Sequence, residues 1–329
     1  MTIDIYTHIA TPRFMAFLEK QGDGIGLLTR LKAKQSLYNL DARFREMDQS
    51  KDYRQVISLP NPPFEELSST ADHSIVEACN DEMAELCAKY PDRFVGFAAA
   101  SDLRDPIAAT REITRAVKDL GAKGSLLYTN VAGRPLDDEC YADFLAQIGA
   151  LGAPIWLHPT RNESMPDYAS EDFSKYEMWW CFGWPYETTV SVTRLILSGL
   201  FDRAPNVQLI THHAAAMIPI FASRIELGLA ALGSRTNVDD GGAQKLRNLK
   251  RPLIDYFRDH LYADTAMFGD TIGVTAALEF FGPDRIVFAS DTPFGPIEKT
   301  IQGVKAMNVD AVTRDKILFG NTARLLKLS

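Results

Sequence analysis

The chain has 329 residues, of which 46% are hydrophobic and 24% charged, as is ordinary for a globular protein. Its net charge is −8 and it contains no basic block, which disfavours binding to nucleic acid because such binding normally requires a basic surface. No basic and apolar leader begins the chain, and its four cysteines lack C-x-x-C spacing, so we expect reduced thiols in a cytoplasmic protein without a membrane segment.

Short apolar segments that alternate with amphipathic helical segments predict the fold class. The expected strands are residues 2–8, 54–59, 93–98, 123–127, 154–158, 207–212, 260–264 and 285–290. Residues 105–121 illustrate the segments between them, because their apolar residues recur at helical spacing and Gly121 supplies an end. Alternation of this kind predicts parallel βαβ units, and eight units predict an α/β fold, a (β/α)8 TIM barrel forming one domain over residues 1–329.

Two of the expected connections are long. Residues 9–53 follow the first strand, and residues 159–190, which contain three tryptophans, follow the fifth strand. Both would lie on the face of the barrel that receives the carboxyl ends of the strands, where barrel enzymes place their active sites.

Polar side chains end several of the expected strands. Tyr6 and His8 are two residues apart on the first strand, so both point to the same side. The other strand-end residues are His158, His212, His213, Asp264 and Asp291. Four of the six histidines therefore meet carboxylates at one rim of the barrel, and such a gathering of nitrogen and oxygen ligands predicts a metal site.

Motifs spread over nearly the whole chain resemble one known family. They are RFREMDQ (43–49), YPDRFVGF (90–97), GRPLDD (133–138), IWLHP (155–159), FGWPYETT (182–189), HHAAAMIP (212–219), YADTAMFG (262–269), FASDTPF (288–294) and GNTARLL (320–326). In order and spacing they resemble the amidohydrolase superfamily, in the branch that contains 2-amino-3-carboxymuconate-6-semialdehyde decarboxylase and the γ-resorcylate-type decarboxylases.

The resemblance implies a site for one divalent metal ion, zinc or manganese. In that family an H-x-H pair on strand 1, a His on strand 5 and an Asp on strand 8 hold the metal. His8, His158 and Asp291 match these ligands directly, and Asp291 is also expected to share in proton transfer.

The family also uses a strand-6 His to move a proton, six residues before a Pro. Pro219 then selects His213, which we expect beside the metal as ligand and proton relay. Alternation along a strand would send His212 to the opposite side, unless the chain has already left the strand. The usual Gly-rich turn after this His is replaced by three alanines, residues 214–216.

Tyr6 stands where the family has the first His of the H-x-H pair. A phenol becomes a ligand only if the metal lowers its pKa, and a tyrosinate suits iron better than zinc. Tyr6 is therefore expected either to bind the metal or to line the pocket.

Three further residues match positions that contact the carboxylated substrate in the semialdehyde decarboxylase. They are Arg43, Trp180 and Arg224, the last of which is supplied there by a neighbouring subunit. Because the planar fork of Arg suits a carboxylate, the resemblance implies a small carboxylate substrate and a homodimer or larger oligomer.

The expected function is non-oxidative decarboxylation of a small unsaturated or aromatic carboxylic acid, with the metal as Lewis acid and His213 as proton relay. One alternative is a monooxygenase with two iron ions, or one manganese and one iron, that uses Tyr6, the His212–His213 pair and Glu187 or Asp264. A metal-dependent hydrolase or hydratase, or an inactive partner subunit, also stays open.

Overall fold

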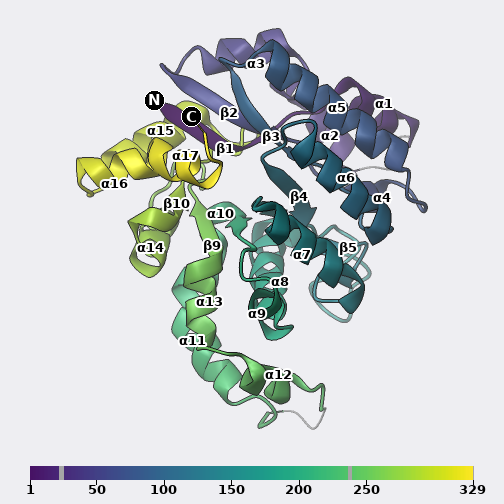
Figure 1. Cartoon of the computed structure of the whole chain (residues 1–329), viewed down its shortest axis with the longest axis vertical. Coiled ribbons are helices and arrows are strands. Elements are labelled where there is room, and N and C mark those ends of the chain that lie inside the picture. Colours follow the sequence, from purple (N-terminus) through teal and green to yellow (C-terminus); the bar gives the residue numbers. More distant parts are fainter. Residues whose placement is uncertain (22–25, 236–238, 329) are drawn as a thin grey trace.

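The computed structural model describes residues 1–21, 26–235 and 239–328 (Figure 1). Eight parallel strands form one sheet in the order β1-β2-β3-β4-β7-β8-β9-β10. Their bounds are β1 Thr2–His8, β2 Tyr53–Ser58, β3 Phe94–Ala99, β4 Gly124–Tyr128, β7 Ile155–His158, β8 Leu209–Thr211, β9 Leu261–Asp264 and β10 Ile286–Val287. Hydrogen bonds from the Ile5 N–H to the Phe288 carbonyl (2.9 Å) and from the His8 N–H to the Thr292 carbonyl (2.8 Å) join the two ends of the sheet. The expected (β/α)8 barrel is confirmed.

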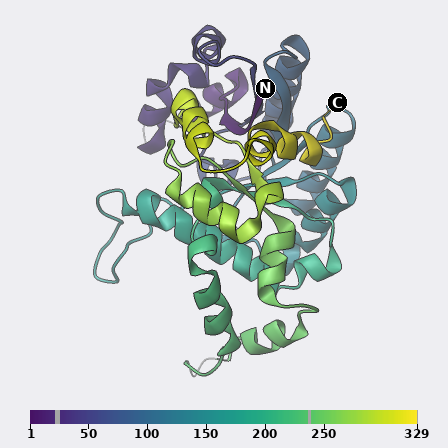
Figure 2. The ribbon, with the colours of Figure 1, turned by 90° about the vertical axis from the view of Figure 1, so that its left-hand side faces the viewer.

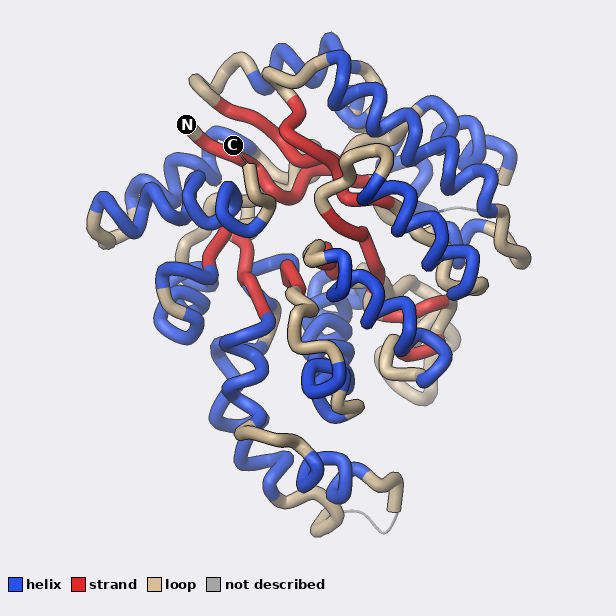
Figure 3. Tube along the Cα trace, viewed as in Figure 1, coloured by secondary structure: helices blue, strands red, loops and turns tan. Residues whose placement is uncertain are grey.

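Helices surround the strands, as Figure 3 shows in blue around red. In the first half of the chain they are α1 Pro12–Lys20, α2 Gly26–Ala33, α3 Leu40–Met47, α4 Phe64–Leu67, α5 His73–Lys89, α6 Pro106–Lys118 and α7 Ala142–Leu151. In the second half they are α8 Trp184–Leu197, α9 Leu200–Arg203, α10 His212–Ala215, α11 Ile218–Ala230, α12 Gly242–Asn248, α13 Leu253–His260, α14 Ile272–Phe281, α15 Ile297–Ala306, α16 Ala311–Asp315 and α17 Asn321–Leu325. A small hairpin, β5 Asn130–Val131 and β6 Arg134–Pro135, follows β4. Within the described residues, no helix is long and apolar enough to cross a membrane.

The helix expected within residues 105–121 is α6. The Asp105 side chain accepts hydrogen bonds from the Ile107 and Ala108 N–H groups and so caps its first turn. The helix ends before Gly121, whose φ of 76° lies in the left-handed region that glycine tolerates best.

Two expected strands are shorter in the structure. β10 contains only Ile286 and Val287, although the residues that follow still bond to β1. β8 ends at Thr211, so that His212, expected as its last residue, already begins a turn. This turn follows from the backbone at residues 213–216, where every φ is positive and strand pairing is therefore impossible.

The two long connections lie on the carboxyl side of the strands, as expected. The first holds α1, α2 and α3, and the second projects from the barrel as a loop before a π-helical turn at Trp179–Gly183 (Figure 2). Both therefore lie beside the strand ends that carry the candidate ligands.

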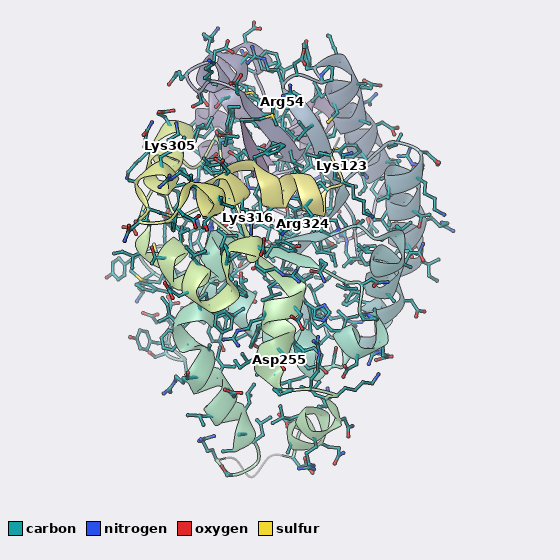
Figure 4. All side chains as sticks on the ribbon, turned by 60° about the vertical axis from the view of Figure 1, so that its left-hand side comes forward. Arg54, Lys123, Asp255, Lys305, Lys316 and Arg324 are labelled. Atoms are coloured by element: carbon teal, nitrogen blue, oxygen red, sulfur yellow. The ribbon has the colours of Figure 1, made fainter. Side chains whose placement is uncertain are left out.

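Basic side chains mark the opposite end of the barrel. Arg54 lies at the start of β2 and Lys123 directly precedes β4, and Figure 4 shows them with Lys316 and Arg324 of the C-terminal helical segments. Asp284 pairs with Lys316 (2.9 Å) and Arg324 (3.6 Å). These cations are remote from the candidate site.

Candidate active site

The strand-end residues meet at one point. The possible ligand atoms of His8, His158 and His212 lie within 4.8 Å of one another, and so do those of His212, His213 and Asp291. His212 belongs to both groups and joins them. The site thus combines the first, fifth, sixth and eighth strands of the barrel.

Three of the histidines are held in the same way, by their Nδ1 atoms. His8 Nδ1 donates to the Leu59 carbonyl (3.1 Å), and His158 Nδ1 donates to the Pro159 carbonyl (2.7 Å). His212 Nδ1 donates to the carboxylate of Asp264. A neutral imidazole with its proton on Nδ1 has a lone pair on Nε2, so each ring offers Nε2 as a metal ligand.

Buried polar atoms without partners show that these residues fit a metal ion. Among the described residues, His8 Nε2, His212 Nε2 and the Tyr6 phenol oxygen are buried without a hydrogen-bond partner. Asp291 Oδ1 lies 3.2 Å from His8 Nε2 and 3.3 Å from His212 Nε2. Unpaired buried polar atoms are rare in native proteins, and imidazole nitrogens beside a carboxylate form the donor set that zinc and manganese accept.

The charges of the site favour a cation. Burial raises the pKa of Asp291, but the adjacent imidazoles of His212 and His8 outweigh burial and hold that pKa well below its usual range. Burial, together with the neighbouring His8 and His212, lowers the pKa of His158 well below its usual value, so this imidazole is neutral. Burial also lowers the pKa of His212, but the carboxylates of Asp264 and Asp291 raise it overall to about 10. Protons and metal ions therefore compete for His212.

Tyr6 lies within this cluster. Its side chain is fully buried, and its ring centroid lies 4.1 Å from that of His212 and 5.6 Å from that of His8. Burial raises the pKa of Tyr6 well above its usual value, and the neighbouring Tyr128 and the carboxylates of Asp264 and Asp291 act in the same direction. The phenol therefore keeps its proton unless a cation offsets these effects.

The turn after β8 explains how two consecutive histidines reach one site. His213 and the alanines at 214–216 all have φ between 55° and 59°, a conformation that costs roughly 1–2 kcal/mol per non-glycine residue. The chain has left the strand here, so the two imidazoles stack with their ring centroids 3.9 Å apart instead of pointing to opposite sides. His213 Nδ1 donates to the Ala266 carbonyl (3.0 Å).

Comparison with known proteins assigns the family. Residues 41–328 match the family model described as Amidohydrolase. The chain belongs to this amidohydrolase family. It is 33% identical to γ-resorcylate decarboxylase of Polaromonas sp. over 88% of this chain and 87% of that protein. It is 23% identical to 2-amino-3-carboxymuconate-6-semialdehyde decarboxylase of Dictyostelium discoideum over 100% of this chain and 92% of that protein. The family resemblance seen in the motifs is confirmed.

Solved structures agree with this assignment. The crystal structure of 2,6-dihydroxybenzoate decarboxylase from Rhizobium superposes with a TM-score of 0.81 and 28% identity over 99% of this chain and 98% of that one. Dihydroxybenzoic acid decarboxylase from Polaromonas sp., solved with bound manganese and the inhibitor 2-nitroresorcinol, gives a TM-score of 0.79 and 27% identity over 99% and 97% of the two chains.

In this barrel Arg43 bonds to the two strands β1 and β2, close to the backbone of His8. Its guanidinium is buried and donates to Gln55 Oε1 (2.7 Å), the His8 carbonyl (2.7 Å) and Thr7 Oγ1 (2.9 Å). These partners make Arg43 a support for the strand that carries His8. A contact between Arg43 and substrate stays a prediction.

The other two expected substrate residues lie apart from each other. Trp180 lines a small cavity of about 30 Å³ that His158 and Asp291 also line. Arg224 is exposed on α11, and its contact with a substrate stays a prediction. The structure therefore brings Trp180, and not Arg224 of the same chain, to the candidate ligands.

Two residues near the candidate ligands have contacts that the motif analysis did not assign to them. Asp264, considered above as a strand-end residue and as an extra ligand, orients His212 and accepts hydrogen bonds from the Ala214 (3.2 Å) and Ala266 (3.1 Å) N–H groups. Arg30 lines the cavity from α2, within a segment where the motifs identified no functional residue.

The extra ligands considered for a second metal are otherwise engaged. Both oxygens of Asp264 already accept hydrogen bonds, and Glu187 lies outside the two ligand groups found among the described residues. Those two groups share His212. This arrangement supports one metal ion and does not favour the dinuclear oxygenase.

Proposed function

We propose that this chain is a metal-dependent, non-oxidative decarboxylase of a small aromatic carboxylic acid. The observation that carries the proposal is the convergence of three imidazoles and the Asp291 carboxylate beside a cavity, in a chain 33% identical to a γ-resorcylate decarboxylase. The family supports decarboxylation as the reaction class, and the cluster of ligands supports a metal ion as the group that assists it.

The residues divide the work between holding the metal and moving a proton. His8, His158, His212 and Asp291 would hold a divalent cation, which when bound supplies Lewis-acid stabilisation of the negative charge that develops on the substrate. As the carboxyl carbon leaves as carbon dioxide, its bonding electron pair stays on the ring carbon, which must then gain a proton. His213 is the candidate relay, because its Nδ1 is fixed on the Ala266 carbonyl and leaves Nε2 to accept and deliver that proton.

His213 itself lies within ligand distance of Asp291 and His212, so its expected place in the ligand set stays a prediction. Burial and the neighbouring His212 lower the pKa of His213 to about 4. A neutral imidazole at neutral pH suits a group that takes up a proton and passes it on.

The test is a decarboxylation assay on a panel of hydroxylated benzoic acids, read as carbon dioxide released and ring product formed. The purified chain loaded with manganese or zinc should convert at least one acid, and chelated protein or a His213→Gln variant should lose most of that activity. A loaded chain that converts none of the panel, or an equally active chelated chain, would refute the proposal.

We infer further that each chain holds one ion, zinc or manganese, and that Tyr6 lines the pocket or coordinates only weakly. The raised pKa of Tyr6 supports a neutral phenol, and manganese is bound in the Polaromonas relative. Elemental analysis of purified protein tests the stoichiometry, because two iron ions per chain would contradict it.

We also propose a cytoplasmic homodimer or larger oligomer in which Arg224 serves the neighbouring subunit. The four cysteines are free, as expected for a reducing compartment. Helix α11, which carries Arg224, extends away from the barrel (Figure 1). Its Ile220 and Leu227 side chains are exposed. Mixing an Arg224→Ala chain with an Asp291→Ala chain should restore part of the activity, whereas an active monomer would refute the shared site.

A further inference from the structure

Arg30 occupies an unusual position between two aromatic rings. Its guanidinium carbon lies 5.2 Å from the centroid of the Trp180 ring and 5.1 Å from that of the Phe294 ring. Such distances are those of cation–π contacts. Among the described residues, no hydrogen bond or ion pair engages this guanidinium.

The two aromatic walls around Arg30 lead down to the candidate metal ligands. On one side the Phe294 ring lies 5.6 Å from that of His8. On the other side the Trp180 ring lies 6.1 Å from that of Trp184, which in turn lies 5.3 Å from that of His158. The guanidinium thus stands at the mouth of a slot with aromatic walls and metal ligands at its inner end.

Arg30 and Trp180 also separate this slot from a larger outer pocket. Both residues line the inner cavity of about 30 Å³ and an outer pocket of about 820 Å³. The inner volume is that of roughly one water molecule, whereas a cavity that holds benzene measures roughly 150 Å³. The slot is therefore too small for an aromatic ring, and the Arg30 guanidinium, held between the Trp180 and Phe294 rings, occupies the space through which such a ring would enter.

Among the described basic side chains along this route, Arg30 is the one free to meet an anion. The residues that line the inner cavity include two with basic side chains, Arg30 and the candidate ligand His158. The outer pocket is also lined by Lys175, whose ammonium pairs with Glu171 (2.9 Å), and by two carboxylates, Glu163 and Glu177. Arg43, the arginine expected to meet substrate, already donates to acceptors within the protein. Arg30 is thus the guanidinium available to an anion at the mouth of the slot.

We propose that Arg30 leaves the slot when the substrate ring enters between Trp180 and Phe294, and then pairs with an anionic group on the outer edge of that ring. The substrate class is therefore an aromatic acid with two anionic groups, one directed to the metal ligands and one to Arg30. This inference takes the aromatic ring of the substrate from the proposed function. It adds a second anionic group on the substrate and Arg30 as the residue that recognises that group.

The test compares ligands that differ in one charge. Isophthalate and terephthalate each carry two carboxylates, and their monoamides replace one carboxylate with a neutral group of nearly the same shape. Binding to the metal-loaded protein is measured by calorimetry. Because a charge-assisted pair with a carboxylate contributes on the scale of a ten- to hundredfold change in affinity, at least one dicarboxylate should bind wild type about ten- to a hundredfold more tightly than its monoamide.

Arg30→Gln should reduce this ratio of affinities to about one, and Arg30→Lys should keep part of it, because Lys retains the charge without the planar fork. Lys175→Gln is the matched control: it removes one positive charge from the same outer pocket and should leave the ratio unchanged. Metal content and melting temperature should match wild type in all three variants. A ratio near one in wild type, or an unchanged ratio in Arg30→Gln, would overturn the assignment.

A second measurement tests the movement out of the slot. Arg30→Ala leaves the slot open and should bind the monoamide at least as tightly as wild type does. Weaker binding would show that the guanidinium supports the ring instead of occupying its place. Since none of these ligands needs to react, an Arg30-dependent ratio in a chain without decarboxylase activity would retain this inference and reject the proposed function.

Discussion

Replacing Asp264 with Asn should weaken metal binding while leaving the barrel folded. Asp264 accepts from His212 Nδ1 with one oxygen and from the Ala214 and Ala266 N–H groups with the other. Asn keeps an oxygen for the two backbone groups, but turns an NH2 group towards His212 Nδ1. Because two donors cannot share a hydrogen bond, the imidazole must move its proton to Nε2, the atom directed at the metal.

The magnitude follows from the role of such partners. Loss of a group that orients a ligating His typically costs ten- to a hundredfold in metal affinity, or about 1.4–2.7 kcal/mol. Competition with a chromophoric chelator measures this affinity, and circular dichroism during heating measures the stability of the fold.

A buried carboxylate elsewhere supplies the control. Asp102 is as buried as Asp264, but it pairs with Arg104 (2.6 Å). Asp102→Asn should cost stability and leave metal affinity unchanged. If Asp264→Asn binds the metal as tightly as wild type does, His212 is not a ligand and the orientation argument is wrong.

Four further substitutions test other parts of the structure. Asp291→Ala should abolish or weaken metal binding, which elemental analysis measures. The circular dichroism spectrum should stay native, because a strand-end residue lines the site and not the core. Tyr6→Phe should keep the metal content and alter substrate affinity; a coloured protein that bleaches on this change would instead identify an iron phenolate. Ala214→Gly should raise the free energy of unfolding by about 0.5–1 kcal/mol in urea titrations, because the strain that glycine relieves at this positive φ exceeds the extra backbone entropy that glycine loses on folding. A loss of stability would show that the backbone at Ala214 is not strained. Burial raises the pKa of Glu65 to about 7 from 4.5, so the folded protein retains a proton that the unfolded chain releases, and stability falls as pH rises from about 4.5 to 7. Glu65→Gln should remove most of this fall, at most about 3 kcal/mol, in unfolding curves at pH 5 and 8; an unchanged slope would show that Glu65 does not titrate there.

The strands and the rim of ligands were predictable because both follow from local rules. Short apolar segments identify buried parallel strands, and the carboxyl ends of such strands meet at one rim whatever the connections do. This rule and the family motifs were enough to predict that His8, His158 and Asp291 lie together.

The turn after β8 was not predictable from composition. Counting back from Pro219 selects His213, and strand alternation then removes His212 from the site. Alanine carries no intrinsic preference for positive φ, so the residue types at 214–216 do not signal the turn that stacks the two imidazoles, although the family has a Gly-rich turn at these positions. The turn is held by Asp264, which lies on another strand, and this long-range contact has no local signature.

The role of Arg43 and the position of Arg30 show a second limit. A motif identifies a residue type and a place in the chain, but not how many acceptors surround the side chain once it is folded. The internal partners of Arg43 come from β1 and β2, which are brought together only by the barrel. Arg30 meets Trp180 and Phe294 from two other connections for the same reason.

Because β1 bonds to the residues that follow β10, the barrel can close only after both segments have been synthesised. During synthesis His8 leaves the ribosome long before Thr292, whose carbonyl accepts the hydrogen bond from the His8 N–H, and before the adjacent Asp291. Until then the first strand exposes one unpaired edge, and His8 and Tyr6 face an unfinished rim. Metal uptake at the complete site therefore follows barrel closure, and the bound ion would fasten together the first and last strands of the finished protein.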